Sequence, residues 1–278
     1  MKIKLIFLSL FLCTALLIGG CGGGDAKDVP ANSDKTQPTS SSSAEKSSSG
    51  FTKISDMADA WNEAYGWHEK AINDYEGMPL LELASAGLTF VSGVQYDLLN
   101  LENKNGHFEG ELMLAGYPAF LDKKGNQLTF GYDIVLEEDG FGPKQKTGDR
   151  KVENGTFQLD KEYYVADCYT ERAGQKIERT YSEFLRLKDG SMMCFDMSGY
   201  TIDAKGDEST SNKAVFIKIS KDKLDVVIGK ATTGTEFKTL SLAGKKDLTK
   251  EQAIEIFETA GYAIETTGGV SGGKFTID

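Results

Sequence analysis

The stretch from Glu162 to Asp203 decides the fold: EYYVADCYTER-AG-QKIERTYSEFLRLK-DG-SMMCFDMSGYTID. Two glycine-containing dipeptides, Ala173-Gly174 and Asp189-Gly190, separate three segments rich in aromatic and β-branched residues. Asp-Gly between such segments favours the tight turn of a β-hairpin. The pattern therefore predicts three antiparallel strands, at 162–172, 176–188 and 191–203.

Apolar residues stand at both parities of these strands, which indicates that both faces of the sheet are covered. One face is predicted to carry Tyr164, Ala166, Cys168, Tyr181, Leu185 and Cys194, and the other Tyr163, Val165, Phe184, Phe195 and Met197.

The sequence on either side extends this meander. Alternation between apolar and polar residues is clearest from Leu128 to Leu136. Further strands are predicted at 88–102, 108–115, 213–220, 223–230 and 236–242, with turns at Asn105-Gly106 and Lys221-Asp222.

Two segments have helical periodicity. Ile54, Met57, Trp61, Tyr65, His68, Ile72 and Tyr75 are spaced as one face of a helix that begins at Ser55 and ends near Gly77. Thr249 and Gln252 predict a capping box for a second helix, 249–260, which Gly261 ends. The predicted fold class is α+β: a curved antiparallel meander, either a half-barrel or a large sheet, with both helices packed against one face.

The first 21 residues have the composition of an export signal. Lys2 and Lys4 precede an apolar run from Leu5 to Ile18, and Gly19-Gly20 precedes Cys21. This arrangement resembles the lipobox of bacterial lipoprotein precursors. The resemblance implies that residues 1–20 are cleaved as a signal peptide and that Cys21 receives a diacylglyceryl group on its sulfur.

Two other interpretations of this segment remain open: an ordinary secretory signal with a chance cysteine, and an uncleaved anchor. A helix over 5–18 would be about 21 Å long, whereas the hydrocarbon core of a bilayer is about 30 Å thick. Lipidation therefore fits best. It predicts a lipid-anchored protein of the cell envelope, on the outer face of a single-membrane cell or in an outer membrane.

Composition divides the remaining chain into two parts. Residues 21–50 hold the lipidated cysteine and a Gly/Ser-rich stretch with few large apolar side chains, which predicts a disordered tether with a span of about 30 Å. Residues 51–278 predict a single globular β-rich domain. The net charge of −11, made more negative by loss of the signal peptide, opposes binding to nucleic acid.

The four cysteines reduce to two in the folded domain, since Cys13 leaves with the signal peptide and Cys21 is the lipid site. The predicted turns place Cys168 opposite Arg179 and Cys194 opposite Leu185. The two thiols would then be about 20 Å apart along the middle strand, too far for a disulfide. Both are predicted to be free and buried.

Three features of the sequence contain residue types that could carry chemistry. Residues 269–273 match the G-x-S-x-G nucleophile pattern, but too few residues follow for the helix that this pattern needs, so a flexible loop before a short strand is expected. His68, predicted to pack, and His107, predicted to be exposed, are too few for a zinc site or a histidine triad. The acidic loop formed by Asp203, Gly206, Asp207 and Glu208 does not fit an EF-hand. No catalytic residue, metal or cofactor is predicted.

A candidate binding face follows from the register set by the Asp189-Gly190 turn. Glu183 would face Asp196, with Arg179 on the same side. The candidate residues are Tyr164, Arg179, Tyr181, Glu183 and Asp196. In the alternative register, a three-residue loop at Lys188-Asp189-Gly190 shifts the pairing by one residue and separates Glu183 from Asp196.

The sequence thus predicts a membrane-anchored extracytoplasmic lipoprotein that binds an envelope ligand or protein without catalysis, and that exposes an aromatic patch. Two alternatives remain open. A helix followed by a long meander looks like the half-barrel of bacterial lipid-carrier lipoproteins, which implies an apolar cavity. An enzyme acting on envelope polymers would instead need two carboxylates facing each other across a cleft.

Overall fold

The computed structural model describes residues 50–74, 104–111, 118–139, 145–202, 208–231, 237, 240–242, 244 and 247–278. These residues belong to one compact unit, Gly50–Asp278. The predicted signal peptide, the tether before Gly50 and the predicted strand at 88–102 lie outside the described residues.

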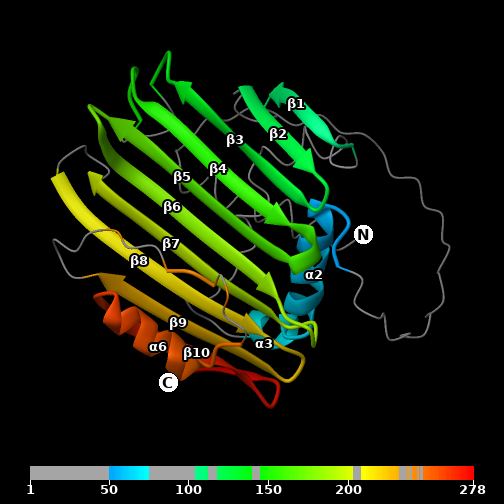
Figure 1. Cartoon of the computed structure of the whole chain (residues 1–278). Helices are drawn as coiled ribbons and strands as arrows, with labels where there is room; N and C mark the ends of the chain where they lie inside the picture. The colour runs from blue at the N-terminus through cyan, green and yellow to red at the C-terminus, as the bar shows by residue number, and fades with distance from the viewer. Residues whose placement is uncertain are drawn as a thin grey trace, which may run out of the picture. The chain divides into compact units, whose positions relative to one another are not determined.

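The described strands form one sheet in which each strand pairs antiparallel with the next, from β1 to β11 (Figure 1). The predicted α+β curved meander is confirmed. The strands are β1 Gly106–Glu111, β2 Pro118–Lys124, β3 Gln127–Val135, β4 Arg150–Gln158, β5 Tyr163–Arg172, β6 Gln175–Arg186, β7 Met192–Ile202, β8 Glu208–Ile219, β9 Lys223–Ala231, β10 Tyr262–Ser271 and β11 Lys274–Ile277.

The register around β6 differs by one residue on each side from the one set by two-residue turns, and at the β6–β7 turn it is the alternative register that a three-residue loop gives. A bulge after Thr170 pairs Cys168 with Thr180 instead of Arg179. The β6–β7 connection is the three-residue loop 188–190, closed by the Leu187 N–H, which donates to the Ser191 carbonyl at 2.8 Å. Gly190 takes a positive φ of 85° there, as three-residue hairpin loops require.

This shift changes the face on which each β6 side chain lies. Phe184 pairs with Cys194, and the predicted pairing of Cys194 with Leu185 is wrong. Phe184 therefore joins Tyr164 in one core, while Tyr181 and Leu185 lie on the opposite face. A one-residue slip moves every side chain of a strand to the other face, which explains the size of the correction.

One face of the sheet curves around the N-terminal helices α2 (Ile54–Gly66) and α3 (Glu69–Asn73), and we call it the concave face. Side chains from all eleven strands join α2 and α3 in one apolar cluster. Trp61 of α2 packs edge-on against Phe184 at 5.2 Å between ring centroids, and Tyr164 lies 6.0 Å from Phe184. The ring packing fixes α2 across one end of the strands.

The single predicted N-terminal helix is broken into two. The break lies at Trp67-His68, where His68 takes a non-helical conformation and its Nε2 lies 2.7 Å from the Ser220 carbonyl oxygen. This contact confirms His68 as a packed residue and turns the chain toward the β8–β9 hairpin. The helix also begins earlier than Ser55, because the Asp56 carboxylate accepts the backbone N–H groups of Thr52 and Lys53.

The second helix, α6 (Lys250–Thr259), lies on the convex face, where it contacts β8, β9 and β10 (Figure 1). The expectation that both helices cover one face was therefore wrong. The predicted capping box is confirmed, since the Thr249 side chain accepts the Gln252 N–H. Both faces of β8 and β9 are apolar because each has its own helical cover.

Three further predictions need correction. Phe237 and residues 240–242, predicted as a strand, are not in one. Residues 262–271 form β10 instead of a loop, and Gly272-Gly273 of the G-x-S-x-G match is its hairpin turn.

Strands β2 and β4 were not predicted. In the acidic loop only Glu208 is described, and it begins β8.

Candidate functional site

The concave face is organised in rows of paired residues that cross the strands. The row nearest the α2 end runs Leu128, Phe157, Tyr164, Phe184, Cys194, Ile217, Val226. The next runs Phe130, Gly155, Ala166, Ser182, Asp196, Val215, Ile228. The concave face is thus apolar near α2, and its first polar pair is Ser182 with Asp196.

The third row consists of polar and ionisable residues. It runs Tyr132, Glu153, Cys168, Thr180, Ser198, Lys213, Lys230, from β3 to β9. We call it the polar row. Every member has a polar or ionisable side chain, although it lies directly beside two mainly apolar rows. This change marks the place where the packed core of the concave face ends.

Solvent reaches the middle of the polar row. Thr180 and Ser198, which pair with each other, are both exposed. Glu153 is only 5% exposed, and Cys168 and Lys213 are half-buried. Burial lowers the pKa of Lys213, an effect that attraction to Glu265 opposes. The row therefore has two exposed hydroxyl groups at its centre, and Cys168 and Lys213, the residues on either side of them, are less exposed.

Asp196 provides a second polar point next to this opening. Its carboxylate accepts a hydrogen bond from the Ser182 hydroxyl. Burial raises the pKa of Asp196 above its usual range, and the bond from Ser182 offsets the rise only in part. Asp196 and Ser198 point from the same strand to the same face, so a ligand at Ser198 lies within one residue pair of this carboxyl.

The two thiols on this face are free, as predicted. Burial and repulsion from Glu153 raise the pKa of Cys168 to about 11. The hydrogen bond between the Tyr132 hydroxyl and the Cys168 sulfur, 3.4 Å apart, lowers the pKa by less than these two effects raise it. Burial also raises the pKa of Cys194. Thiolate is the nucleophilic form, so neither cysteine is activated at neutral pH.

We expect both thiols to be slow to alkylate in the folded protein. At pH 8, Cys168 should react about 100-fold more slowly than an exposed thiol, because its raised pKa reduces the thiolate fraction by that factor. The control is a Ser271→Cys variant, which adds a thiol at an exposed turn. Alkylation by iodoacetamide at each cysteine is followed by mass spectrometry. Equal rates at Cys168 and at the added cysteine would contradict this prediction.

The predicted binding face is divided between the two sides of the sheet. Tyr164 and Asp196 lie on the concave face, and Tyr164 is fully buried in the aromatic core. Arg179, Tyr181 and Glu183 lie together on the convex face. Glu183 pairs with Phe195 and not with Asp196, so the two carboxylates do not face each other, as the alternative register with a three-residue loop predicts.

On the convex face Glu183 holds a segment of the protein itself. Glu183 is 1% exposed and accepts hydrogen bonds from the Tyr181 hydroxyl and from the Leu242 backbone N–H. Arg179 forms a bidentate pair with Asp167 at 2.7 and 2.8 Å, and its guanidinium lies 4.8 Å from the Phe237 ring centroid. These three predicted residues therefore support the chain around 237–242.

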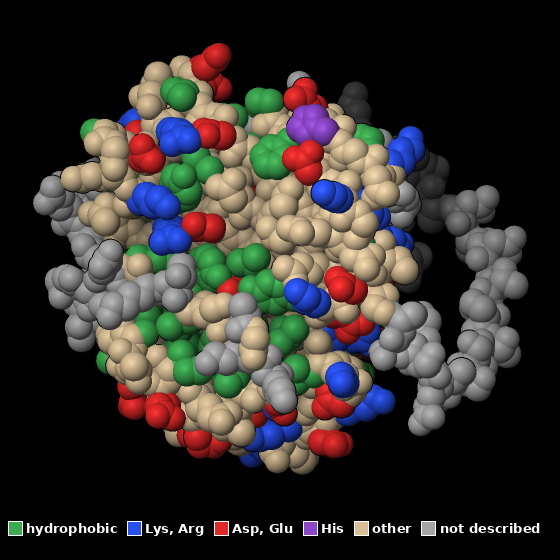
Figure 2. Space-filling model, in the orientation of Figure 1, with side chains coloured by type: hydrophobic (Ala, Val, Ile, Leu, Met, Phe, Trp, Pro, Cys, Tyr) green, Lys and Arg blue, Asp and Glu red, His purple; other side chains and the backbone are tan. Residues whose placement is uncertain are grey.

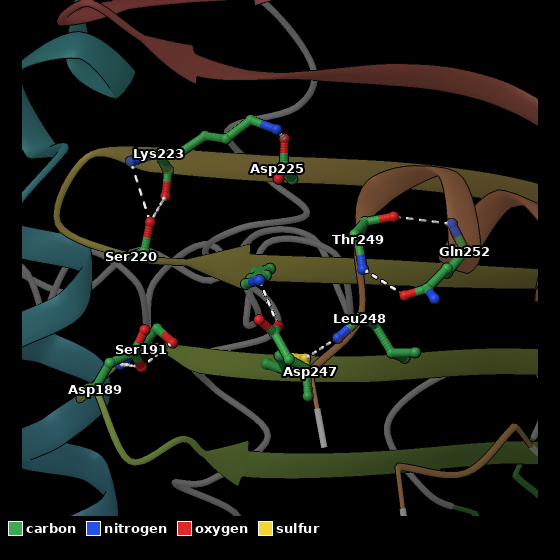
Figure 3. Close-up of polar contacts among 11 residues, drawn as sticks. Asp189, Ser191, Ser220, Lys223, Asp225, Asp247, Leu248, Thr249 and Gln252 are labelled. Carbon is green, nitrogen blue, oxygen red and sulfur yellow. Dashed lines mark hydrogen bonds and ion pairs between the residues drawn. The ribbon is translucent and has the colours of Figure 1, made fainter. Parts of the chain in front are cut away.

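Asp247 and Leu248, which precede α6, are attached to β7 and β8 on the same face (Figure 3). The Leu248 N–H donates to the Met193 sulfur at 3.4 Å, and Lys218 binds the Asp247 carboxylate. Hydrophobic side chains gather across the middle of this face, with charged side chains of both signs around them (Figure 2). Among the described residues, Val135 and Ile277 are the large hydrophobics that are strongly exposed, so the expected aromatic patch is not seen there.

His107, at the β1–β2 edge, offers a pH-dependent contact. Its Nδ1 lies 2.7 Å from the Asp122 carboxylate and its Nε2 lies 3.3 Å from the Glu109 carboxylate. The hydrogen bonds that the ring donates to Asp122 first, and to Glu109, raise the His107 pKa. The contact therefore stabilises the hairpin fully below the unfolded-state pKa of about 6.5, and this contribution is lost as pH rises through the folded-state pKa.

We expect His107 to titrate above 6.5 in an NMR pH titration. The chain has two histidines, so a His107→Gln variant assigns both ring signals. In an Asp122→Asn variant the His107 pKa should fall toward the unfolded value. A midpoint at or below 6.5 in the wild-type protein would show that the two carboxylates do not hold the imidazolium.

Three carboxylates held against the sheet, those of Glu153, Asp196 and Glu183, do not meet in one place. Glu153 on β4 and Asp196 on β7 are separated by three strand spacings, about 14 Å, which exceeds the 5–9.5 Å used by glycosidases. Glu183 lies on the other face. Within the described ranges no group of three or more His, Cys, Asp or Glu side chains is arranged to hold a metal ion.

No protein-family model matches this chain, and neither a curated protein nor a solved structure is significantly similar to it. None of the helices in the described part of the chain combines the length and apolar character needed to cross a membrane.

Proposed function

We propose that this chain is the precursor of a lipid-anchored extracytoplasmic protein whose domain binds a hydrophilic ligand on its concave face. The observation that carries the binding proposal is the polar row, in which the exposed Thr180 and Ser198 lie directly beside the packed rows of the same face.

The chemistry of the row suggests the class of ligand. Thr180 and Ser198 both donate and accept hydrogen bonds, the neighbouring Asp196 is a carboxyl with a raised pKa, and Lys213 is a half-buried cation. Such groups recognise hydroxyl, amide and carboxylate functions. The ligand is therefore a small polar molecule, such as a saccharide or a short envelope peptide, and no catalytic step is assigned.

A lipid carrier is the second candidate, because the open meander curved around an N-terminal helix has the half-barrel form of that class. Two observations weigh against it. The apolar half of the concave face is filled by α2 and α3, and the remaining half carries the polar row. A carrier of acyl chains instead needs an unfilled apolar surface on this face.

The anchor is tested by a Cys21→Ser variant expressed in a lipoprotein-processing bacterium. We expect wild-type protein to fractionate with membranes and the variant to leave them, because the diacylglyceryl group is attached only to Cys21. Two acyl chains hold a protein stably, at ~0.8 kcal/mol per buried CH₂. A Cys13→Ser variant is the matched control and should stay with the membranes. Retention of the Cys21→Ser variant would refute lipidation.

A further inference from the structure

A fourth row of paired residues borders the exposed centre of the polar row, on the side away from α2. It runs Ile134, Lys151, Thr170, Glu178, Tyr200, Ser211, from β3 to β8. Glu178 and Tyr200 pair with each other and are both half-buried. Asp196 borders the same centre on the side toward α2. We call the surface formed by Thr180, Ser198, Glu178, Tyr200 and Asp196 the concave patch.

A carboxylate lies at one corner of the concave patch. Glu178 and Thr180 are two residues apart on the same face of β6, about 7 Å. The Glu178 charge reaches the polar row, since it adds to the effects that raise the pKa of the Cys168 thiol, of which burial is the first. A negative charge placed over Thr180 would be repelled by Glu178, and by Asp196 when that carboxyl is ionised. The patch therefore disfavours an anionic ligand.

Two lysines border the patch on the next strands. Lys213 on β8 pairs with Ser198, and Lys230 on β9 pairs with Lys213. Burial first, and repulsion from Lys230, lower the pKa of Lys213, whereas attraction to Glu265 opposes them. A positive charge placed over Ser198 would meet these two lysines. The patch therefore disfavours a cationic ligand as well.

An uncharged ligand with many hydroxyl groups suits these side chains. The hydroxyls of Thr180 and Ser198 both donate and accept hydrogen bonds, and the Glu178 carboxylate accepts them. The Tyr200 ring adds an apolar surface against which the C–H face of a sugar ring can pack. An extended peptide suits the patch less well, because it would add to an exposed sheet edge, whereas β6 and β7 are each paired on both sides.

We propose that the concave patch binds an uncharged saccharide, with sugar hydroxyls on Thr180, Ser198 and Glu178 and a sugar ring against Tyr200. This inference rests on the proposed function, in which the polar row is the ligand site. It makes Glu178 and Tyr200 specificity-determining residues: Glu178 selects against anions, and Tyr200 selects for a ring with an apolar face.

Three trisaccharides of different charge test the ligand class. The full lipidated protein is purified from its membrane in a detergent without a sugar headgroup, and binding is measured by isothermal titration calorimetry. The probes are the trimer of N-acetylglucosamine, its deacetylated cationic form, and anionic trigalacturonic acid. We expect the uncharged trimer to bind and each charged trimer to bind at least ~10-fold more weakly. Equal or tighter binding of a charged trimer, or no binding of the uncharged one, would overturn the inference.

Variants of the two specificity-determining residues sharpen the test. Tyr200→Ala should weaken binding of the uncharged trimer about 5-fold, whereas Tyr200→Phe keeps the ring and should bind as wild type does. Tyr169→Ala is the matched control, since it removes a half-buried ring that pairs with Arg179 on the convex face. Glu178→Gln should selectively raise the affinity for the anionic trimer. Equal affinities of Tyr200→Ala and Tyr169→Ala would contradict the role of the ring.

Failure of this inference and failure of the proposed function give different results. If a hydrophilic molecule bound by the wild type is lost from Ser198→Tyr but is not a saccharide, only the saccharide class is overturned. If Ser198→Tyr binds the uncharged trimer with wild-type affinity, the polar row itself is refuted as the ligand site.

Discussion

Replacing Phe184 with alanine should lower the free energy of unfolding by about 3–5 kcal/mol, the usual cost of removing a fully buried phenyl ring. Phe184 is 0% exposed and stands at the centre of the concave core, between Trp61 of α2 and Tyr164 of β5. The loss combines apolar transfer with a cavity that a sheet paired on both sides of β6 cannot close. Urea unfolding followed by tryptophan fluorescence would measure it.

Phe120 provides the matched control for this substitution. It lies half-buried on β2, outside both apolar clusters. Phe120→Ala should cost less than about 1 kcal/mol, because a partly exposed ring has less transfer energy to lose. If the two variants were equally destabilised, the ring packing that joins α2 to the sheet would not be the main support of this core.

Glu183→Ala should destabilise the protein by roughly 3 kcal/mol, because it leaves two donors, one buried and one part-buried, without an acceptor at once. The Tyr181 hydroxyl and the Leu242 N–H both donate to this carboxylate. The Leu242 amide should also lose protection in hydrogen exchange, since its bond to Glu183 holds the 240–242 segment on the sheet.

Two variants separate this role from a general effect of losing a charge. Glu255→Ala removes an exposed carboxylate from α6 and should change stability by less than about 0.5 kcal/mol. Glu183→Gln keeps an acceptor oxygen and should fall between the wild-type protein and Glu183→Ala. Unchanged protection of Leu242 in Glu183→Ala would contradict the assigned role.

Most of the strand order could be predicted because local signals were consistent. Alternation marked β3, hairpin signals marked the turns around β6, β7 and β9, and Thr249 with Gln252 marked the start of α6. Strand β4 was missed because Asn154 and Gly155 interrupt it. Gly155 is needed there, since a Cβ would meet the Phe130 ring at 2.0 Å. That requirement comes from a neighbouring strand and is not visible in the local sequence.

The site was harder to predict than the fold because it depends on register. One bulge after Thr170 and one additional loop residue at the β6–β7 turn decide which face each β6 side chain occupies. Both are single-residue effects, whereas the hydrophobic pattern of β6 is similar at both parities. The polar row also draws one residue from each of seven strands, so no continuous motif could reveal it. Of the five predicted binding residues, only Asp196 lies beside it.

Native mass spectrometry of the full protein, purified from its own membrane, tests the binding proposal most directly when wild type is compared with Ser198→Tyr. The account predicts that wild type carries a small hydrophilic molecule and that Ser198→Tyr, which fills the centre of the polar row, loses it. Ser271→Tyr, at an exposed turn, should retain it. A bound lipid, no bound molecule, or the same bound molecule in Ser198→Tyr would contradict the account.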